Sequence, residues 1–105
     1  MKDIILKINK LFENRIRLGI MSMLMVNDHV DFNTLKNTLN VSDGNLASHS
    51  QALEKEGYIR VKKQFIGKRP NTTYRVTEAG KIAFQEHLDA LEKLIRGTES
   101  RDINN

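Results

Sequence analysis

The stretch from Ser42 to Val76 reads SDGNLASHSQALEKEGYIRVKKQFIGKRPNTTYRV, and it decides the fold of the 105-residue chain. Ser42 is a good helix N-cap, because its hydroxyl can accept a hydrogen bond from the free amides of the next turn. Gly57 is the residue type favoured just past a helix end. The stretch therefore predicts a helix over 43–56. Strand-like runs over 58–65 and 72–76, separated by a turn over 67–71, then predict a β-hairpin.

The segments before this stretch predict three more helices. Residues 2–12 carry one apolar stripe and predict an amphipathic helix. Asn14 is a plausible cap for a second helix over 15–26, which is apolar on most sides and is expected to be the central buried helix. Residues 30–32 suffice for a turn or a single strand pairing. A short helix is then expected over 33–39, followed by a turn over 40–42.

The segment after the hairpin predicts a last helix. Thr77 is placed to cap a helix over 78–96, on which Phe84, Leu88, Leu91 and Ile95 form a heptad-like seam. The tail over 97–105 has Ile103 as its one apolar residue and is expected to be frayed. The elements together predict one α+β, mostly helical domain over 1–96, with a core unit over 14–77.

The positive charge is concentrated in the hairpin. Residues 57–76 hold six basic residues and no acidic one, whereas the rest of the chain holds 11 basic and 13 acidic residues. Such segregation indicates an anionic partner. The chain has no cysteine, which excludes disulfides, thiolate zinc sites and cysteine nucleophiles. No apolar run approaches the roughly 20 residues of a membrane span, and the N-terminus is unlike a secretory signal. No membrane role is expected, and a cytoplasmic location is the default expectation.

The predicted helix over 43–56 has an unusual outer face. Leu46, Ser50 and Leu53 are expected to face the core. The outer side and its flank offer short polar side chains at Asn45, Ser48, His49 and Gln51, which can donate to and accept from base edges. Gly44 and Ala52 are small enough to allow close approach to a groove. No arginine or lysine precedes Lys55 on this helix, which predicts a larger share for phosphate contacts and groove shape in the affinity.

Five segments resemble winged-helix regulators of the MarR and ArsR type, in the right order and over most of 14–95. They are Asn14–Leu24, Phe32–Lys36, Val41–His49, Leu53–Ile59 and Tyr74–Lys81. The resemblance implies a winged helix-turn-helix with flanking N- and C-terminal helices. It also implies a sequence-specific, double-stranded DNA-binding transcription regulator that acts as a homodimeric repressor.

The resemblance also implies which residues meet DNA. The helix over 43–56 would enter the major groove, the hairpin would act as a basic wing on the adjacent backbone or minor groove, and the start of the helix over 33–39 would donate to the backbone. Arg60 and Lys62 share one strand face and Lys63 lies on the other; the sequence leaves open which face meets the duplex. The residues expected at DNA are Asn33, Thr34, Ser42, Gly44, Asn45, Ser48, His49, Gln51, Lys55, Lys62, Lys68 and Arg69.

The terminal helices leave two alternatives open, because their apolar faces can pack on each other within one chain or against a second copy. The resemblance favours a dimer. The residues expected at its interface are Ile4, Ile5, Ile8, Leu11, Phe12, Phe84, Leu88, Leu91 and Ile95.

Other functions are weighed by the same residues. A protein-docking module is the alternative to DNA binding, but docking surfaces tend to be apolar at their centre, whereas DNA demands positive charge. No enzyme is expected, since no phosphate loop, paired carboxylates or nucleophile with its base is present. No cofactor or metal is expected, because His29, His49 and His87 lack ligand spacing and Asp28-His29 is typical of a turn. A small-molecule effector stays an open question.

Overall fold

The computed structural model describes residues 1–97, and most of the predicted frayed tail (98–105) lies outside the described residues. The elements, in chain order, are α1 (Lys2–Leu6), η1 (Lys10–Phe12, one turn of 3-10 helix), α2 (Arg15–Met25), β1 (Val30–Asp31), α3 (Phe32–Leu39), α4 (Asp43–Lys55), β2 (Ile59–Ile66), β3 (Arg69–Val76) and α5 (Glu78–Arg96). The predicted α+β, mostly helical fold is confirmed. None of the helices in the described part is long and apolar enough to cross a membrane.

Polar side chains fix where the predicted helices begin. The Asn14 side chain accepts hydrogen bonds from the amides of Ile16 and Arg17 at the start of α2. The Ser42 hydroxyl accepts from the Asn45 amide, 3.1 Å away, at the start of α4. The Thr77 hydroxyl caps α5 by accepting from the Gly80 amide at 2.9 Å, and it donates to the Gly57 carbonyl at 2.6 Å. Thr77 therefore ties the start of α5 to the end of α4.

The N-terminal segment is not the single helix predicted over 2–12. The chain leaves α1 after Leu6 and re-enters a helical turn only at Lys10, because Asn9 has an extended backbone with φ −84° and ψ 116°. The Asn9 amide donates to Nδ1 of His87 at 3.0 Å, and Nδ2 of Asn9 donates to the Tyr58 hydroxyl at 3.1 Å. These long-range partners replace the hydrogen bonds of a continuous helix.

The hairpin is longer and tighter than predicted. The three strands lie in the order β1-β3-β2, and the β2–β3 pairing runs from Ile59 opposite Val76 to Ile66 opposite Arg69. Only Gly67 and Lys68 remain in the turn, with Gly67 in the left-handed region at φ +64°. The prediction of a five-residue turn is wrong, because Pro70 continues β3. At Pro70 the strand has a neighbour on one side only, and an open strand edge tolerates the missing N–H.

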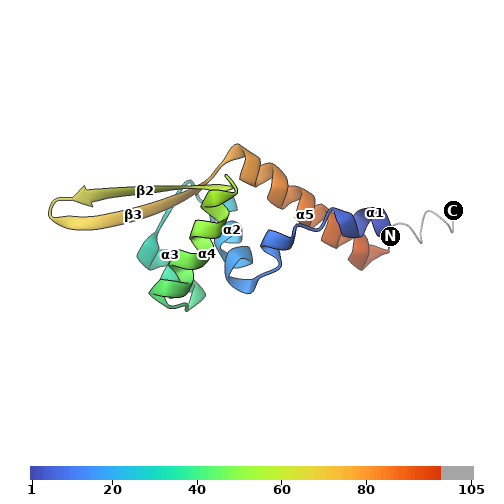
Figure 1. Ribbon diagram of the computed structural model, residues 1–105, viewed down its shortest axis with the longest axis horizontal. Coiled ribbons are helices and arrows are strands. Elements are labelled where there is room, and N and C mark those ends of the chain that lie inside the picture. The colour runs from blue at the N-terminus through green and yellow to red at the C-terminus, as the bar shows by residue number, and fades with distance from the viewer. Residues whose placement is uncertain (98–105) are drawn as a thin grey trace.

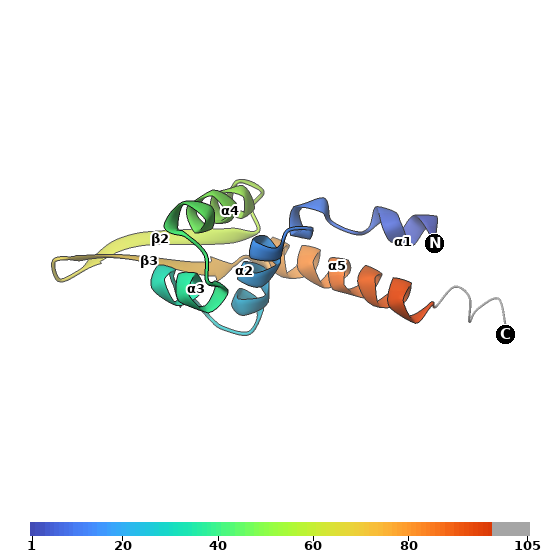
Figure 2. The same ribbon diagram turned by 90° about the horizontal axis from the view of Figure 1, so that it is seen from below.

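The core surrounds α2, as its apolar pattern predicts. Ile20, Met21 and Leu24 of α2 pack with residues from the other helices and the sheet, namely Phe12, Leu35, Leu46, Leu53, Ile59, Tyr74 and Phe84. Phe12 forms the aromatic centre, with its ring edge-on to Phe84 at 5.1 Å between centroids. The hairpin projects from one end of the helices, and α1 lies along α5 at the other end (Figures 1 and 2).

Candidate nucleic-acid interface

The helix-turn-helix is built from α3, the turn over 40–42 and α4. Asn40 ends α3 in the left-handed conformation at φ 52°, which turns the chain sharply towards α4. Nζ of Lys36 then lies 2.7 Å from a carboxylate oxygen of Asp43, so an ion pair joins the last turn of α3 to the first turn of α4. The turn and this ion pair both connect α3 to α4. In Figure 1, α4 lies in front of α2.

The exposed face of α4 matches the pattern of its sequence. Leu46, Ser50 and Leu53 are buried, and the Ser50 hydroxyl donates to the Ala47 carbonyl at 3.2 Å. The exposed residues on the other side include Gly44, Asn45, Ser48, Gln51 and Lys55. A shallow hollow runs along this side near its C-terminal end, lined by Ser48, Gln51, Ala52, Glu54 and Lys55. The face is uncharged over its first turns and open to a partner.

His49 occupies a different position from its predicted neighbours on α4. Its side chain is half-buried at the flank facing α2, with Nδ1 2.8 Å from Nη1 of Arg17. Burial, and then the charge of Arg17, lower the pKa of His49. Sequence reasoning missed Arg17, because it lies 32 residues before His49 and neither residue carries a local signal for the contact.

Two predicted polar residues are already engaged by the fold. The Ser42 hydroxyl serves as the cap of α4. The Thr34 amide donates to Asp31 at 2.8 Å, and hydrogen bonds from the Thr34 side chain and amide lower the pKa of Asp31. The amide of Thr34 is therefore already bound to the carboxylate of Asp31, which caps α3. The neighbouring Asn33 is exposed.

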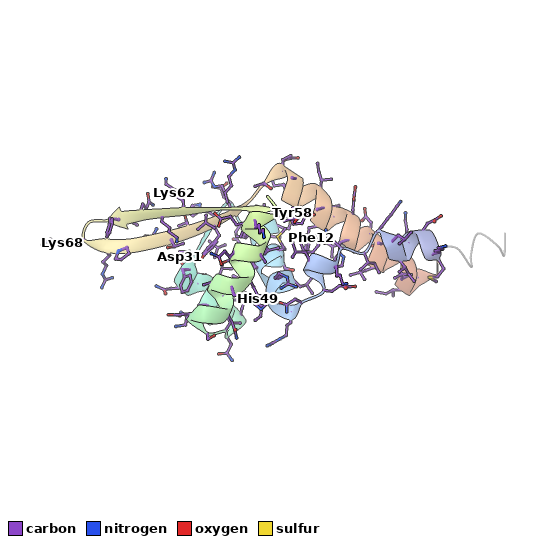
Figure 3. All side chains as sticks on the ribbon, viewed as in Figure 1. Phe12, Asp31, His49, Tyr58, Lys62 and Lys68 are labelled. Carbon is purple, nitrogen blue, oxygen red and sulfur yellow. The ribbon has the colours of Figure 1, made fainter. Side chains whose placement is uncertain are left out.

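The strand register separates the basic residues of the hairpin into two faces. Arg60 lies opposite Arg75 and Lys62 opposite Thr73, whereas Lys63 lies on the alternate face, which closer to the root carries the buried Ile59 and Tyr74. Lys62 points away from α3 and α4 in Figure 3. An open hollow at the hairpin root nevertheless joins Arg60, Lys62 and Arg75 to Glu54 of α4. Lys62 therefore shares a hollow with Glu54, near the C-terminal end of α4, and with no residue from the first turns of α4.

The tip of the hairpin carries Lys68 and Arg69 far from the helices. Lys68 lies in the turn at the extreme end of the molecule (Figure 3), and Arg69 opens β3 opposite Ile66. Phe65 and Ile66 beside them are 73% and 61% exposed, which is unusual for such large apolar residues. The sequence predicted a strand that ends at Phe65 and left Ile66 outside it, and it did not indicate that both side chains stay largely uncovered by residues 1–97. The tip combines positive charge with uncovered apolar side chains.

The terminal apolar residues divide between the core and the surface. Ile4, Phe12 and Phe84 are at most 7% exposed and are already covered within the single chain. Their place at a dimer interface stays a prediction. Ile5, Leu88 and Ile95 are 52%, 38% and 84% exposed. Ile8, Leu11 and Leu91 are half-buried, and Leu6 and Ile82 are exposed residues that the prediction omitted. An apolar surface therefore remains at this end of the molecule.

The histidines and acidic residues of the described part are dispersed. His29 and Asp28 are exposed neighbours with Nδ1 3.3 Å from Oδ2. Within 1–97, no three histidine, aspartate or glutamate side chains gather into a group that could hold a metal ion.

A capped helix-turn-helix followed by a basic two-stranded wing defines a winged-helix DNA-binding regulator. The family model described as winged helix DNA-binding domain matches residues 16–95, and the chain belongs to this family. An uncharacterized protein of Methanocaldococcus jannaschii is 33% identical over 90 residues, which cover 86% of this chain and 98% of that relative.

Solved structures place the fold among regulators of the MarR type. The transcriptional regulator homologue from Pyrococcus horikoshii is 31% identical, with a TM-score of 0.80 over 92% of this chain and 94% of that one. MarR itself shares the fold at 17% identity, with a TM-score of 0.67 over 90% of this chain and 79% of that one. The predicted resemblance is confirmed, and DNA is the partner of this class of regulator.

Proposed function

We propose that the protein is a sequence-specific repressor that binds duplex DNA as a homodimer, with α4 in the major groove and the β2–β3 wing on the adjacent backbone or minor groove. The observation that carries the proposal is the uncharged polar face of α4 on the same molecule as a basic hairpin tip. A merely solvated helix would mix acidic and basic residues over this face. Repression follows if the bound dimer blocks access to a promoter.

Base reading in this proposal comes from the first turns of α4. Asn45 and Ser48 are exposed and can both donate and accept, and Gln51 extends the same face by one further turn. Gly44 has nothing within 4 Å of an added Cβ, so the backbone can approach a groove without a side chain in between. The N-terminal turns of a recognition helix are those that usually contact base edges.

Affinity comes from phosphate contacts at the wing tip and at the end of α4. Lys68 and Arg69 are exposed at the tip, and Lys55 is exposed in the last turn of α4. Each neutralised phosphate releases condensed counterions, so binding that uses these residues weakens steeply with salt.

A second copy of the chain is proposed to cover the apolar surface on α1 and α5. Ile5, Leu88 and Ile95 are exposed there, and the hairpin projects from the opposite end of the molecule. A two-fold dimer through this end would present two α4 helices to half-sites about 34–36 Å apart. Light scattering at micromolar concentration is expected to give twice the monomer mass, and a monomeric mass would contradict this part.

The test of DNA binding is fluorescence anisotropy over a range of salt, with duplex from upstream of the gene and with random duplex. Replacing Lys68 and Arg69 together by alanine is expected to weaken both complexes and to reduce the salt slope by about two. Lys2→Ala with Lys93→Ala, on the α1 and α5 end, is the matched control and should leave the slope unchanged. No binding to either duplex at low salt would overturn the proposal in favour of a docking module.

A further inference from the structure

A side chain of α2, that of Arg17, contacts the flank of α4. Arg17 reaches across from α2 and donates through Nε to the carbonyl of Leu11 in η1 at 2.5 Å. Its Nη1 lies 2.8 Å from Nδ1 of His49. The guanidinium is thus held on one side by main chain and points on the other at a residue of α4.

The chemistry of the two groups assigns the proton on the imidazole. Every nitrogen of a guanidinium is a donor and none can accept, so Nδ1 of His49 is the acceptor and carries no proton. The single N–H of the neutral ring must then lie on Nε2. The partial burial of the ring, and then the charge of Arg17, favour this neutral form and lower the pKa of His49.

The outer nitrogen of His49 is open to a partner. No hydrogen bond joins Nε2 to any group in the described part of the chain, and no buried side-chain nitrogen or oxygen there lacks a partner, so Nε2 must be reached by solvent. His49 follows Asn45 by one helical turn, on the edge of the exposed face of α4. The ring therefore presents a single N–H donor beside Asn45.

We propose that Arg17 is a positioning residue for DNA reading. It fixes the tautomer of His49 in which Nε2 carries the proton, so that this ring can only donate a hydrogen bond to an acceptor on a base edge. This rests on the proposed DNA-binding function and names a specificity element within it. In the major groove the groups that can accept from Nε2–H are N7 and O6 of guanine, N7 of adenine and O4 of thymine. The amino group of cytosine is itself a donor and cannot accept this hydrogen bond. Arg17 sets this preference without touching DNA.

The first test replaces His49 by asparagine or glutamine, because each amide side chain imitates one of the two ring nitrogens. The amide of asparagine ends at about the reach of Nδ1, and that of glutamine at about the reach of Nε2. His49→Gln keeps an outer donor and is expected to keep the base preference found by selection from a random duplex pool. His49→Asn keeps an acceptor for Arg17 but no outer donor, and should lose about threefold to tenfold of the discrimination at one base pair of each half-site.

The second test removes the residue that fixes the tautomer. Arg17→Met leaves Nδ1 without a donor, so the ring can carry its proton on either nitrogen. The same base pair should become degenerate to the same extent, and adding His49→Asn should cause no further loss. Arg17→Lys keeps one donor, and its discrimination at this base pair is expected to lie between that of the wild type and that of Arg17→Met. It carries the test if Arg17→Met does not fold.

The tautomer itself is measured without DNA. Imidazole nitrogen chemical shifts in the free protein should report the Nε2–H form of His49 in the wild type and a mixture in Arg17→Met. A Nδ1–H ring in the wild type would overturn the proposal, as would an unchanged base preference in His49→Asn. A uniform loss across all sequences would place the donor on a phosphate and also overturn base reading. Absence of binding to any duplex is a different failure, since it removes the proposed function while the tautomer result stands.

Discussion

The root and the tip of the hairpin are made from the same two strands but meet opposite physical conditions. At the root, Ile59 and Tyr74 are 2% and 4% exposed and pack into the core. At the tip, Phe65 and Ile66 are 73% and 61% exposed beside Lys68 and Arg69. Burial at the root stabilises the fold, whereas side chains at the tip contribute almost nothing to it. Stability and DNA binding should therefore respond to different residues of one element.

The largest expected effect is at the aromatic centre beneath the root. Phe12→Ala removes a buried ring that contacts Phe84 and Tyr58, with centroids 5.1 and 5.3 Å away, and should cost about 3–5 kcal/mol of unfolding free energy. Phe65→Ala, at the tip, should stay within about 0.5 kcal/mol of the wild type. Urea unfolding of the two variants measures both. A comparable loss in each would mean that the tip is packed, which would break the comparison.

The next effect comes from two glycines. A Cβ added to Gly80 would lie 2.1 Å from the Tyr58 carbonyl oxygen, where strand β2 is about to begin. Gly80→Ala should therefore cost about 1–3 kcal/mol or more, because backbone has to move. Gly44→Ala meets no atom and should stabilise α4 by up to about 1 kcal/mol. In thermal melts of the two variants the changes in stability should have opposite signs, and Gly44→Ala should still weaken DNA binding.

The buried histidine of α5 gives a pH dependence. Nδ1 of His87 accepts from the Asn9 amide, and burial lowers its pKa against the smaller opposing effect of Glu13. The unfolded chain then takes up the proton first, so stability should fall as the pH drops through about 6.5, the ordinary histidine value, and should level off below the folded pKa.

His49 contributes in the same direction, because its pKa is also lowered. His87→Gln should flatten part of the curve of melting temperature against pH, while His29→Gln, at an exposed position, should leave it unchanged. A wild-type melting temperature that does not fall below about pH 6.5 would contradict this reading.

The smallest expected effect lies at the root, on the face of the hairpin opposite Ile59 and Tyr74. Arg60 and Arg75 face each other across the strands, and like charges directly opposite are destabilising. Arg60→Thr should stabilise the hairpin by a few tenths of a kcal/mol, about 0.2–0.5, and the gain should shrink as salt is added. Arg69→Thr, whose opposite residue is Ile66, offers the control without a like-charged partner. A loss of stability in Arg60→Thr would show that Arg60 has a stabilising partner instead.

The fold was predictable where its signals are local. Asn14, Ser42 and Thr77 each cap a helix that the sequence places within one residue, because a capping side chain and its amide lie two or three residues apart. The break after α1 was not predictable, since it depends on His87, 78 residues from Asn9 in the chain. The tight turn was missed because a proline in a strand is tolerated only where the other edge is free, which is a property of the sheet.

For the candidate site, too, the sequence predicted what depends on local patterns but not the contacts between distant elements. Helical periodicity alone indicates which side of α4 is exposed, and strand alternation separates Lys62 from Lys63. Neither pattern states that Arg17 contacts His49, or that Phe12 and Phe84 belong to the core of one chain. These depend on how α2, α5 and η1 pack in three dimensions.

The two-residue turn at Gly67 and Lys68 also limits how such a wing can evolve. An extra residue in one strand would transfer every side chain beyond it to the opposite face, which would exchange the environments of Lys62 and Lys63. Only insertions of two residues in each strand preserve the faces, and each adds about 6.6 Å of reach at about 3.3 Å per residue. The distance between the helices and the basic tip can therefore change only in fixed steps, and relatives with longer or shorter wings should differ by whole numbers of these two-residue steps.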